Sequence, residues 1–224
     1  MKQGLRIAVE GNIGVGKSTL LPRLQHILSS GKKFDQPWSV MAERVDEDPE
    51  FKRLLEAFYQ DPNKQVDLQS WITKRRLDEY RALAGNPGNV LFERSFLGEV
   101  VFCHANLVRH ERPEGDYIRF FYDVTAALKE CRYDAVIYLK ASPETCFSRI
   151  RFRSRAAESN IPFDYVQYLH ACYEAHLPES ARVHNIPVVT IDWDQFGSAE
   201  QVAERLETAL DYYGQSNLPQ LKRG

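Results

Sequence analysis

The feature that most constrains this chain is a glycine-rich run close to its start, GNIGVGKST at residues 11–19. The run matches the pattern GxxxxGKS/T, with Gly11, Gly16, Lys17 and Ser18 at the fixed positions, and it follows an apolar segment typical of a strand. Glycines let backbone N–H groups point inward around an anion, and a following helix adds the positive end of its dipole. The run therefore predicts a phosphate-binding loop between a strand and a helix.

Each part of such a loop has a defined role toward a nucleoside triphosphate. We expect Lys17 to reach the β- and γ-phosphates and the Ser18 hydroxyl to bind Mg²⁺. The predicted donor site consists of Gly11, Asn12, Ile13, Gly14, Val15, Gly16, Lys17, Ser18 and Thr19. The alternative is a glycine-rich turn that binds no ligand.

Two classes of nucleotide-binding protein are disfavoured by the rest of the sequence. A switch GTPase carries DxxG after a strand and the base-reading motif NKxD, and neither is present. A motor ATPase usually carries an aspartate that closes an apolar strand. The strand expected at 90–93 ends instead as Phe92-Glu93-Arg94-Ser95.

Short apolar runs alternate with longer helical segments along the whole chain. The expected strands are 5–10, 38–42, 90–93, 135–140 and 188–192, and their continuous apolar character suits a parallel sheet that is covered on both faces. The expected helices are 17–29, 48–59, 67–84, 97–108, 116–130, 143–157, 163–176 and 198–213. This alternation predicts one α/β domain over 1–213, with a flexible tail at 214–224.

The composition is that of an ordinary globular protein, with 43% hydrophobic residues, 27% charged residues and a net charge of −2. Nucleic acid polymers and anionic membranes are therefore not expected as partners, and no apolar run is long enough to span a membrane. An apolar strand follows Met1 almost at once, so we expect a cytoplasmic protein, although a chain trimmed of a targeting segment would look the same. The four cysteines lack metal-ligand spacing and are expected to be free thiols.

Charged residues stand at the ends of the second and third expected strands. Glu43 follows the strand at 38–42, and Glu93 and Arg94 close the strand at 90–93. Because the carboxyl ends of parallel strands meet at one edge of the sheet, these side chains should lie beside the phosphate loop. A carboxylate there can accept the proton of an attacking hydroxyl, and an arginine can stabilise a transferring phosphoryl group. Each residue could also be part of an ordinary surface ion pair.

Arginines are concentrated in the sequence RIRFRSR at residues 149–155. If this segment is helical, Arg149 and Arg153 share one face, and Arg151 and Arg155 lie about 200° around the helix from them. A nucleic-acid patch would explain the run, but the chain is slightly acidic and has no other basic cluster. A lid over the triphosphate, at about 149–160, explains it better, because guanidinium groups match phosphate oxygens.

Several further motifs, taken in order, resemble those of the deoxyribonucleoside kinases, the family of deoxycytidine kinase, deoxyguanosine kinase and mitochondrial thymidine kinase. The resemblance extends from Ile7 to about Tyr213 and implies a P-loop kinase fold with an arginine-rich lid. The motifs that carry it are GNIGVGKST, Phe58-Tyr59-x-Asp61-Pro62, Leu68-Gln69-Ser70-Trp71, Glu93-Arg94-Ser95, the stretch Ile137–Cys146, the lid arginines, and Ile161-Pro162-x-x-Tyr165-x-x-x-Leu169-His170.

The resemblance implies a role for each matching residue. Glu43 resembles the general base for the nucleoside 5′-hydroxyl, with Arg94 beside it, and Glu93 resembles the carboxylate that helps to hold Mg²⁺. The residues expected to contact the nucleoside are Tyr59 and Glu158 at the sugar 3′-hydroxyl and Gln69 at the base. The residues expected around ATP are Arg149, Arg153 and Arg155 of the lid and Phe196 of the adenine loop at 192–196. The resemblance also implies a homodimer through the helices at 67–84 and 116–130.

The sequence departs from the family pattern in three places. The lid usually has two adjacent glutamates, whereas here it has Ala157 and Glu158, and the general base lacks the prolines that often flank it. In the family, an arginine and an acid at the positions of Arg76 and Glu99 accompany deoxycytidine and purine substrates, although the acid is usually aspartate. We therefore expect deoxycytidine or a purine deoxynucleoside to be favoured over thymidine. Arg76 and Glu99 could instead form a surface salt bridge.

Taken together, these observations predict transfer of the ATP γ-phosphate, with Mg²⁺, to the 5′-hydroxyl of a deoxynucleoside in nucleotide salvage. The residues expected to act in catalysis are Glu43, Arg94, Lys17 and Arg153. One alternative is a nucleoside monophosphate kinase, for which Arg76 and the neighbouring Lys74 and Arg75 could bind the acceptor phosphate. Another is a nucleotide-binding module that has lost its activity.

Overall fold

A parallel sheet forms the centre of the structure, a computed structural model that describes residues 4–31, 33–43, 48–108, 114–155, 158 and 160–216. Within these residues the sheet has five strands in the order β2-β3-β1-β4-β5, and all neighbouring strands are parallel. The strands are β1 (Arg6–Glu10), β2 (Trp38–Met41), β3 (Asn89–Glu93), β4 (Ala135–Lys140) and β5 (Val188–Asp192). The predicted α/β fold is therefore confirmed, and each predicted strand agrees with the structure to within one residue.

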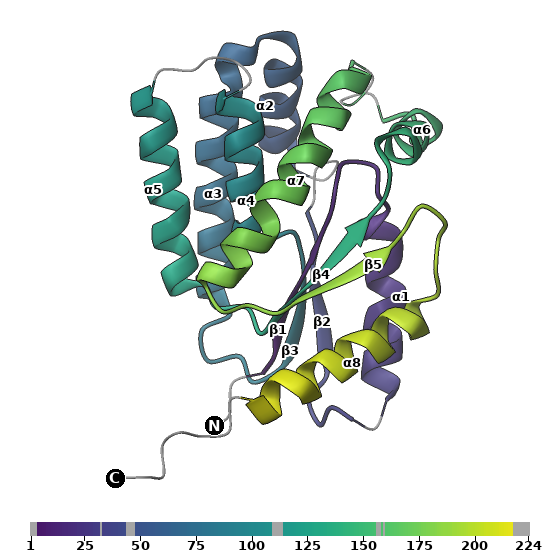
Figure 1. Ribbon diagram of the computed structural model, residues 1–224. Helices are drawn as coiled ribbons and strands as arrows, with labels where there is room; N and C mark the ends of the chain where they lie inside the picture. The colour runs from purple at the N-terminus through teal and green to yellow at the C-terminus, as the bar shows by residue number, and fades with distance from the viewer. Residues whose placement is uncertain are drawn as a thin grey trace.

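The helices cover both faces of this sheet. They are α1 (Lys17–Ser30), α2 (Pro49–Gln60), α3 (Gln65–Ala82), α4 (Phe96–Cys103), α5 (Glu114–Glu130), α6 (Pro143–Arg153), α7 (Phe163–Val183) and α8 (Ala199–Ser216). Figure 1 shows α1 and α8 together on one side of the sheet and α3, α4, α5 and α7 on the other. A short 3₁₀ turn (Pro62–Lys64) precedes α3, and a π-helical turn (His104–Val108) follows α4.

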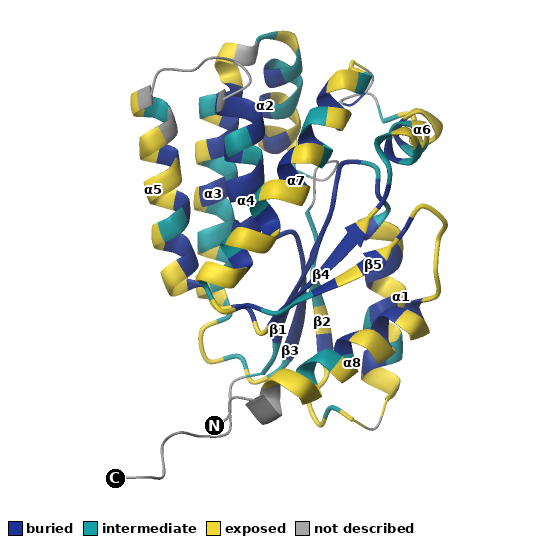
Figure 2. Cartoon of the chain, in the orientation of Figure 1, coloured by how far each residue is buried: buried dark blue, intermediate teal, exposed yellow. Residues whose placement is uncertain are grey.

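The strand β1 is central, and all of its residues are buried (Figure 2). Its neighbours β3 and β4 lie on either side, so the connection from β1 to β2 and the connection from β3 to β4 run in opposite directions along the sheet. In an open α/β sheet, ligands bind at the carboxyl ends of the strands where the strand order reverses. The register pairs Val9 with Glu93 and places the ends of β1, β2 and β3 at the same edge.

Several helix ends differ from the prediction. The helix expected at 143–157 ends at Arg153, because Ser154 adopts a left-handed conformation with φ of 53°. Arg155 therefore lies outside the helix. The prediction that Arg151 and Arg155 share the helix face opposite Arg149 and Arg153 is wrong. The helix expected at 163–176 continues to Val183 through Pro178, since Leu177 and Ala181 are buried against the core.

The end of the chain also differs from the prediction in part. The helix α8 continues to Ser216, so residues 214–216 belong to it rather than to a tail, and residues 217–224 lie outside the described part of the chain. Ser142 caps α6, with its hydroxyl accepting from the Thr145 N–H. All four cysteines are buried free thiols, as predicted. No helix in the described ranges combines the length and apolar character that crossing a membrane requires.

Candidate active site

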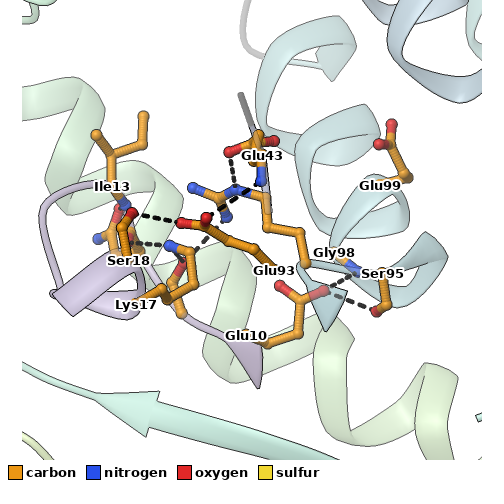
Figure 3. Close-up of polar contacts among 12 residues, drawn as sticks. Glu10, Ile13, Lys17, Ser18, Glu43, Glu93, Ser95, Gly98 and Glu99 are labelled. Atoms are coloured by element: carbon orange, nitrogen blue, oxygen red, sulfur yellow. Dashed lines mark hydrogen bonds and ion pairs between the residues drawn. The ribbon is translucent and has the colours of Figure 1, made fainter. Parts of the chain in front are cut away.

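The glycine-rich loop joins β1 to α1 and closes around the ammonium group of Lys17. This group donates to the carbonyl oxygens of Gly11 and Asn12, both at 3.0 Å, and the residue is only 5% exposed (Figure 3). Burial, followed by the nearby charge of Arg94, lowers the pKa of Lys17 to about 8. A phosphate group bound in the loop would offset both effects, because it brings negative charge to the ammonium.

The outer side of the loop is covered by an aromatic ring and an arginine. Gly16 has a φ of 106°, and a Cβ atom added there would lie 2.7 Å from the ring of Phe196. The guanidinium of Arg149 stacks over the same ring at 3.9 Å and donates to the carbonyl oxygens of Val15 and Asp194 at 2.9 Å. Arg149 and Phe196 therefore connect the loop to the segment after β5.

The loop residues differ in where their side chains lie. Asn12 is buried and supports the loop, since its amide donates to the Val166 carbonyl at 3.0 Å and accepts from the Ile13 N–H at 2.8 Å. Ile13 lines the adjoining pocket, whereas Thr19 is exposed in the first turn of α1. The predicted donor site is thus one continuous loop in which only some side chains face the pocket.

Ser18 and Glu93 form a small group of oxygen atoms beside Lys17. The Ser18 hydroxyl donates to Glu93 Oε1 at 2.7 Å, and Glu93 Oε2 accepts from the Glu43 N–H at 3.1 Å. No cluster of three or more histidine, cysteine or acidic side chains suitable for a metal occurs in the described part of the chain. One hydroxyl and one carboxylate are a suitable donor set for Mg²⁺, which keeps several waters and takes phosphate oxygens as ligands.

Glu43 lies between two arginines at the end of β2. Its Oε2 accepts from Arg94 Nε at 3.0 Å, and its Oε1 lies 3.5 Å from Arg76 Nη2. Burial alone would raise the pKa of Glu43, but the charges of Arg94, Arg76 and Lys17 together hold it below its usual value. Glu43 is therefore an ionised carboxylate at neutral pH, which is the state that a general base requires.

Arg94 follows β3 in a conformation that is rare for a residue with a side chain. Its φ is 70°, and such residues cost about 1–3 kcal/mol unless their surroundings hold them. The guanidinium is buried, donates to the Gly11 carbonyl at 3.1 Å, and lies 4.7 Å from the centre of the Phe102 ring. Burial would lower the pKa of Arg94, but the Tyr173, Glu43 and Glu10 groups outweigh it and raise the pKa above its usual value.

A second polar group lies between α3 and α4. The Gln69 amide donates to Glu99 Oε2 at 2.5 Å, Arg76 Nε donates to Glu99 Oε1 at 3.0 Å, and the Thr73 hydroxyl lies 3.4 Å from Oε2. Glu99 is only 3% exposed, so the alternative of a surface salt bridge is wrong. Burial raises the pKa of Glu99 above its usual value, although Arg76 and Gln69 offset part of this effect.

The arginine-rich segment meets the site through Glu158. Arg153 pairs with Glu158 Oε2, and Arg155 Nη1 lies 3.4 Å from Glu158 Oε1. Burial, followed by the neighbouring Tyr165 and Glu158 groups, raises the pKa of Tyr59 well above its usual value, so its hydroxyl stays protonated. Ala157, which marks the departure from the family lid, lies outside the described residues.

One pocket brings most of the predicted residues together. It extends from the glycine-rich loop to Glu99, and the predicted residues that line it are Ile13, Gly14, Gly16, Lys17, Ser18, Glu43, Tyr59, Gln69, Arg76, Glu93, Arg94, Glu99, Arg153, Arg155 and Glu158. Asn106 lines the same pocket and was not predicted to contact a ligand, and Phe102 lines it too. Tyr165 also lines it and donates to Asn106 Oδ1 at 2.6 Å, and the motif that contains Tyr165 was the only local signal for it.

The central sheet, the glycine-rich loop and this pocket define a P-loop kinase fold, as predicted. The chain belongs to the deoxynucleoside kinase family, since the family model described as "Deoxynucleoside kinase" matches residues 7–212. It is an ATP-dependent deoxynucleoside kinase, and the expected family and activity are confirmed.

Relatives with different substrate names are similar to this chain. A deoxyadenosine kinase of Dictyostelium discoideum is 27% identical over 99% of this chain and 87% of its own length. A thymidine kinase of Ictalurid herpesvirus 1 is 30% identical over 92% of this chain and 86% of its own length. A solved deoxyadenosine kinase from M. mycoides with bound dATP has a TM-score of 0.74 at 27% identity, covering 91% of this chain and 99% of the other. The family match therefore does not select the base.

Proposed function

We propose that this kinase phosphorylates deoxycytidine or a purine deoxynucleoside in preference to thymidine, and that it does so at the 5′-hydroxyl. The observation that carries the proposal is the hydrogen-bonded group of Gln69, Arg76 and Glu99 in the pocket, in which Gln69 and Glu99 are buried. Arg76 donates to Glu99, so Glu99 acts there as an acceptor. The exocyclic amine of cytosine or adenine can donate to such a carboxylate, whereas the keto oxygen of thymine would face another acceptor.

The proposal is tested by measuring kcat/KM for the four deoxynucleosides with ATP and Mg²⁺. We expect deoxycytidine or a purine deoxynucleoside to exceed thymidine by at least about tenfold, because a polar site leaves its buried groups unpaired when the wrong base binds. The variant Glu99→Leu should lose most of this preference. A preference of the wild-type protein for thymidine would contradict the proposal, and activity on nucleoside monophosphates alone would favour the alternative kinase class.

The same geometry supports a mechanism for the transfer. Glu43 accepts the proton of the 5′-hydroxyl, and Arg94 orients this carboxylate and keeps it ionised. Lys17 neutralises charge on the β- and γ-phosphates, and Arg153 moves from Glu158 toward the transferring phosphoryl group. Tyr59 and Glu158 hold the sugar 3′-hydroxyl. Direct in-line transfer depends mainly on positioning and electrostatics, so no covalent intermediate is required.

Around the donor, we assign the adenine to the segment that includes Phe196. Arg149 lies on this ring and contacts the loop carbonyl of Val15, so it joins the adenine side of the site to the phosphate side. Arg155 already lies beside Glu158 in the pocket. These contacts support a lid in which Arg149 stays at the donor base while Arg153 and Arg155 reach the phosphates.

Mg²⁺ would be held by the Ser18 hydroxyl and by Glu93, directly or through water. When bound, the ion neutralises charge on the phosphates and orients them for in-line transfer. We expect turnover to stop when Mg²⁺ is chelated, and the variant Ser18→Ala to need roughly ten- to a hundredfold more Mg²⁺ for half-maximal turnover. Titration of initial rates with Mg²⁺ measures this effect. An unchanged Mg²⁺ requirement in Ser18→Ala would contradict the assignment, and Ser30→Ala, a serine at the far end of α1, is the control.

We also propose that the protein is a cytoplasmic homodimer whose subunits meet through α3 and α5. The helix α5 carries partly exposed apolar side chains, with Ile118 at 42% and Tyr122 at 69% exposed. Burial of such side chains against a second copy would contribute to association.

A further inference from the structure

A buried carboxylate at the end of β1 has no place in the mechanism described so far. Glu10 is 0% exposed, and both of its oxygens accept hydrogen bonds. Oε1 accepts from the Ser95 hydroxyl at 2.7 Å and from the Gly98 N–H at 3.2 Å, and Oε2 accepts from the Tyr173 hydroxyl at 3.0 Å (Figure 3 shows the first two contacts). A carboxylate held by three donors in the core requires an explanation, because burying a charge is costly.

The hydroxyl of Tyr173 connects this carboxylate to the active site. It accepts from Arg94 Nη1 at 2.7 Å while it donates to Glu10. Burial, followed by the charge of Glu10, raises the pKa of Tyr173 well above its usual value, so the hydroxyl stays protonated and can donate. A continuous chain of hydrogen bonds therefore leads from Glu10 through Tyr173 and Arg94 to Glu43.

Glu10 also holds the backbone that follows Arg94. Ser95 and Gly98, its other two partners, lie directly after Arg94 at the start of α4, and the Ser95 hydroxyl also accepts from the Leu97 N–H. A Cβ atom at Gly98 would lie 2.5 Å from Glu10 Oε1, so the first turn of α4 is packed against the carboxylate. Glu10 thus contacts the side chain of Arg94 through Tyr173 and its backbone through Ser95.

We propose that Glu10 and Tyr173 are positioning residues that hold the Arg94 guanidinium at Glu43. A guanidinium has several donors and rotatable bonds, and the Glu43 carboxylate alone restrains only one side of it. The Tyr173 hydroxyl and the Gly11 carbonyl both accept from Nη1 on the other side, and the shorter hydrogen bond to Tyr173 is strengthened by the negative charge behind it. The inference rests on the roles proposed above for Arg94 and Glu43.

The conservative variant Tyr173→Phe tests the inference. It removes the hydroxyl and keeps the ring, so we expect kcat to fall roughly ten- to a hundredfold while the KM values for the nucleoside and ATP change by less than about threefold. The matched control is Tyr138→Phe, because Tyr138 stacks on Tyr173 with a ring-centre distance of 5.8 Å but donates to Glu174. The control should keep the wild-type kcat. Thermal unfolding of Tyr173→Phe and Tyr138→Phe shows whether the two variants lose the same amount of stability when a buried hydroxyl is removed.

A double-variant cycle with Arg94→Lys separates positioning from a structural role. If Tyr173 acts through Arg94, the loss of kcat from Tyr173→Phe should be small once Arg94→Lys is present. The variant Glu10→Gln, which keeps the shape and removes the charge, should lower kcat to a similar degree as Tyr173→Phe. Wild-type kcat in Tyr173→Phe, or losses that multiply in the double variant, would overturn the inference. Undiminished kcat in Glu43→Gln would instead overturn the roles proposed for Glu43 and Arg94, on which the inference rests.

Discussion

Replacement of Glu43 by glutamine is expected to lower kcat roughly 10²- to 10⁴-fold, the usual contribution of a general base. The substitution keeps the size of the side chain and removes its ability to accept a proton. Glu43 is suited to this role because Arg94 at 3.0 Å and Arg76 at 3.5 Å keep the carboxylate ionised. Steady-state rates with the preferred nucleoside give kcat, and calorimetry gives the affinity for ATP, which should stay close to that of the wild type.

The matched control is Glu130→Gln. Glu130 is also paired with an arginine, Arg81 at 2.6 Å, but it is exposed at the end of α5. We expect this variant to retain wild-type kcat. Undiminished turnover in Glu43→Gln would refute the role given to Glu43, whereas equal losses in both variants would mean that a lost ion pair, rather than a lost base, causes the effect.

Replacement of Lys17 by methionine is expected to lower kcat/KM for ATP roughly 10²- to 10³-fold, as removal of a single preorganised charge in an active site generally does. The ammonium is buried beneath the loop and donates to the carbonyls of Gly11 and Asn12, so a phosphate would meet it already in position. Methionine keeps the apolar stem and removes only the charge and the donors. The measurement is the initial rate as a function of ATP concentration.

The control for this variant is Lys140→Met. Lys140 ends β4, is largely exposed and pairs with Glu174, so loss of its charge should leave kcat/KM for ATP within about twofold of the wild type. If kcat/KM for ATP changed as little in Lys17→Met as in the control, the proposed contact between Lys17 and the phosphates would be contradicted. Circular dichroism distinguishes a loss of ATP binding from a loss of folding.

The residues that the sequence predicted best are those with a local pattern. The spacing of Gly11, Gly16, Lys17 and Ser18 depends only on neighbouring residues, and the structure places this run between β1 and α1 as expected. Glu43 and Glu93 could be expected to lie together, because parallel strands bring their carboxyl ends to one edge. The Glu43 N–H indeed donates to Glu93 at 3.1 Å.

The arginine-rich segment shows where a local pattern misleads. The run at 149–155 was expected to continue one helix, but Ser154 ends it, so Arg155 turns back to Glu158 instead of lying on a helical face. A helix end of this kind depends on the backbone angles of one residue and on what the next residues contact. Serine carries no strong signal for a left-handed conformation, so the end could not be found in the sequence.

The sequence by itself determined the donor loop, the order of strands and helices, and the acidic and basic residues at the strand ends, because these follow from spacing and apolar periodicity. Only the tertiary structure decided that Glu99 is buried against Gln69 and Arg76, and that Glu10 and Tyr173 stand behind Arg94. From the sequence pattern, Glu10 is only the last residue of a strand, and Tyr173 is only one aromatic residue of an amphipathic helix. They lie 163 positions apart in the chain, and only the packing of α7 against α4 brings a hydroxyl, a carboxylate and a guanidinium within hydrogen-bond distance.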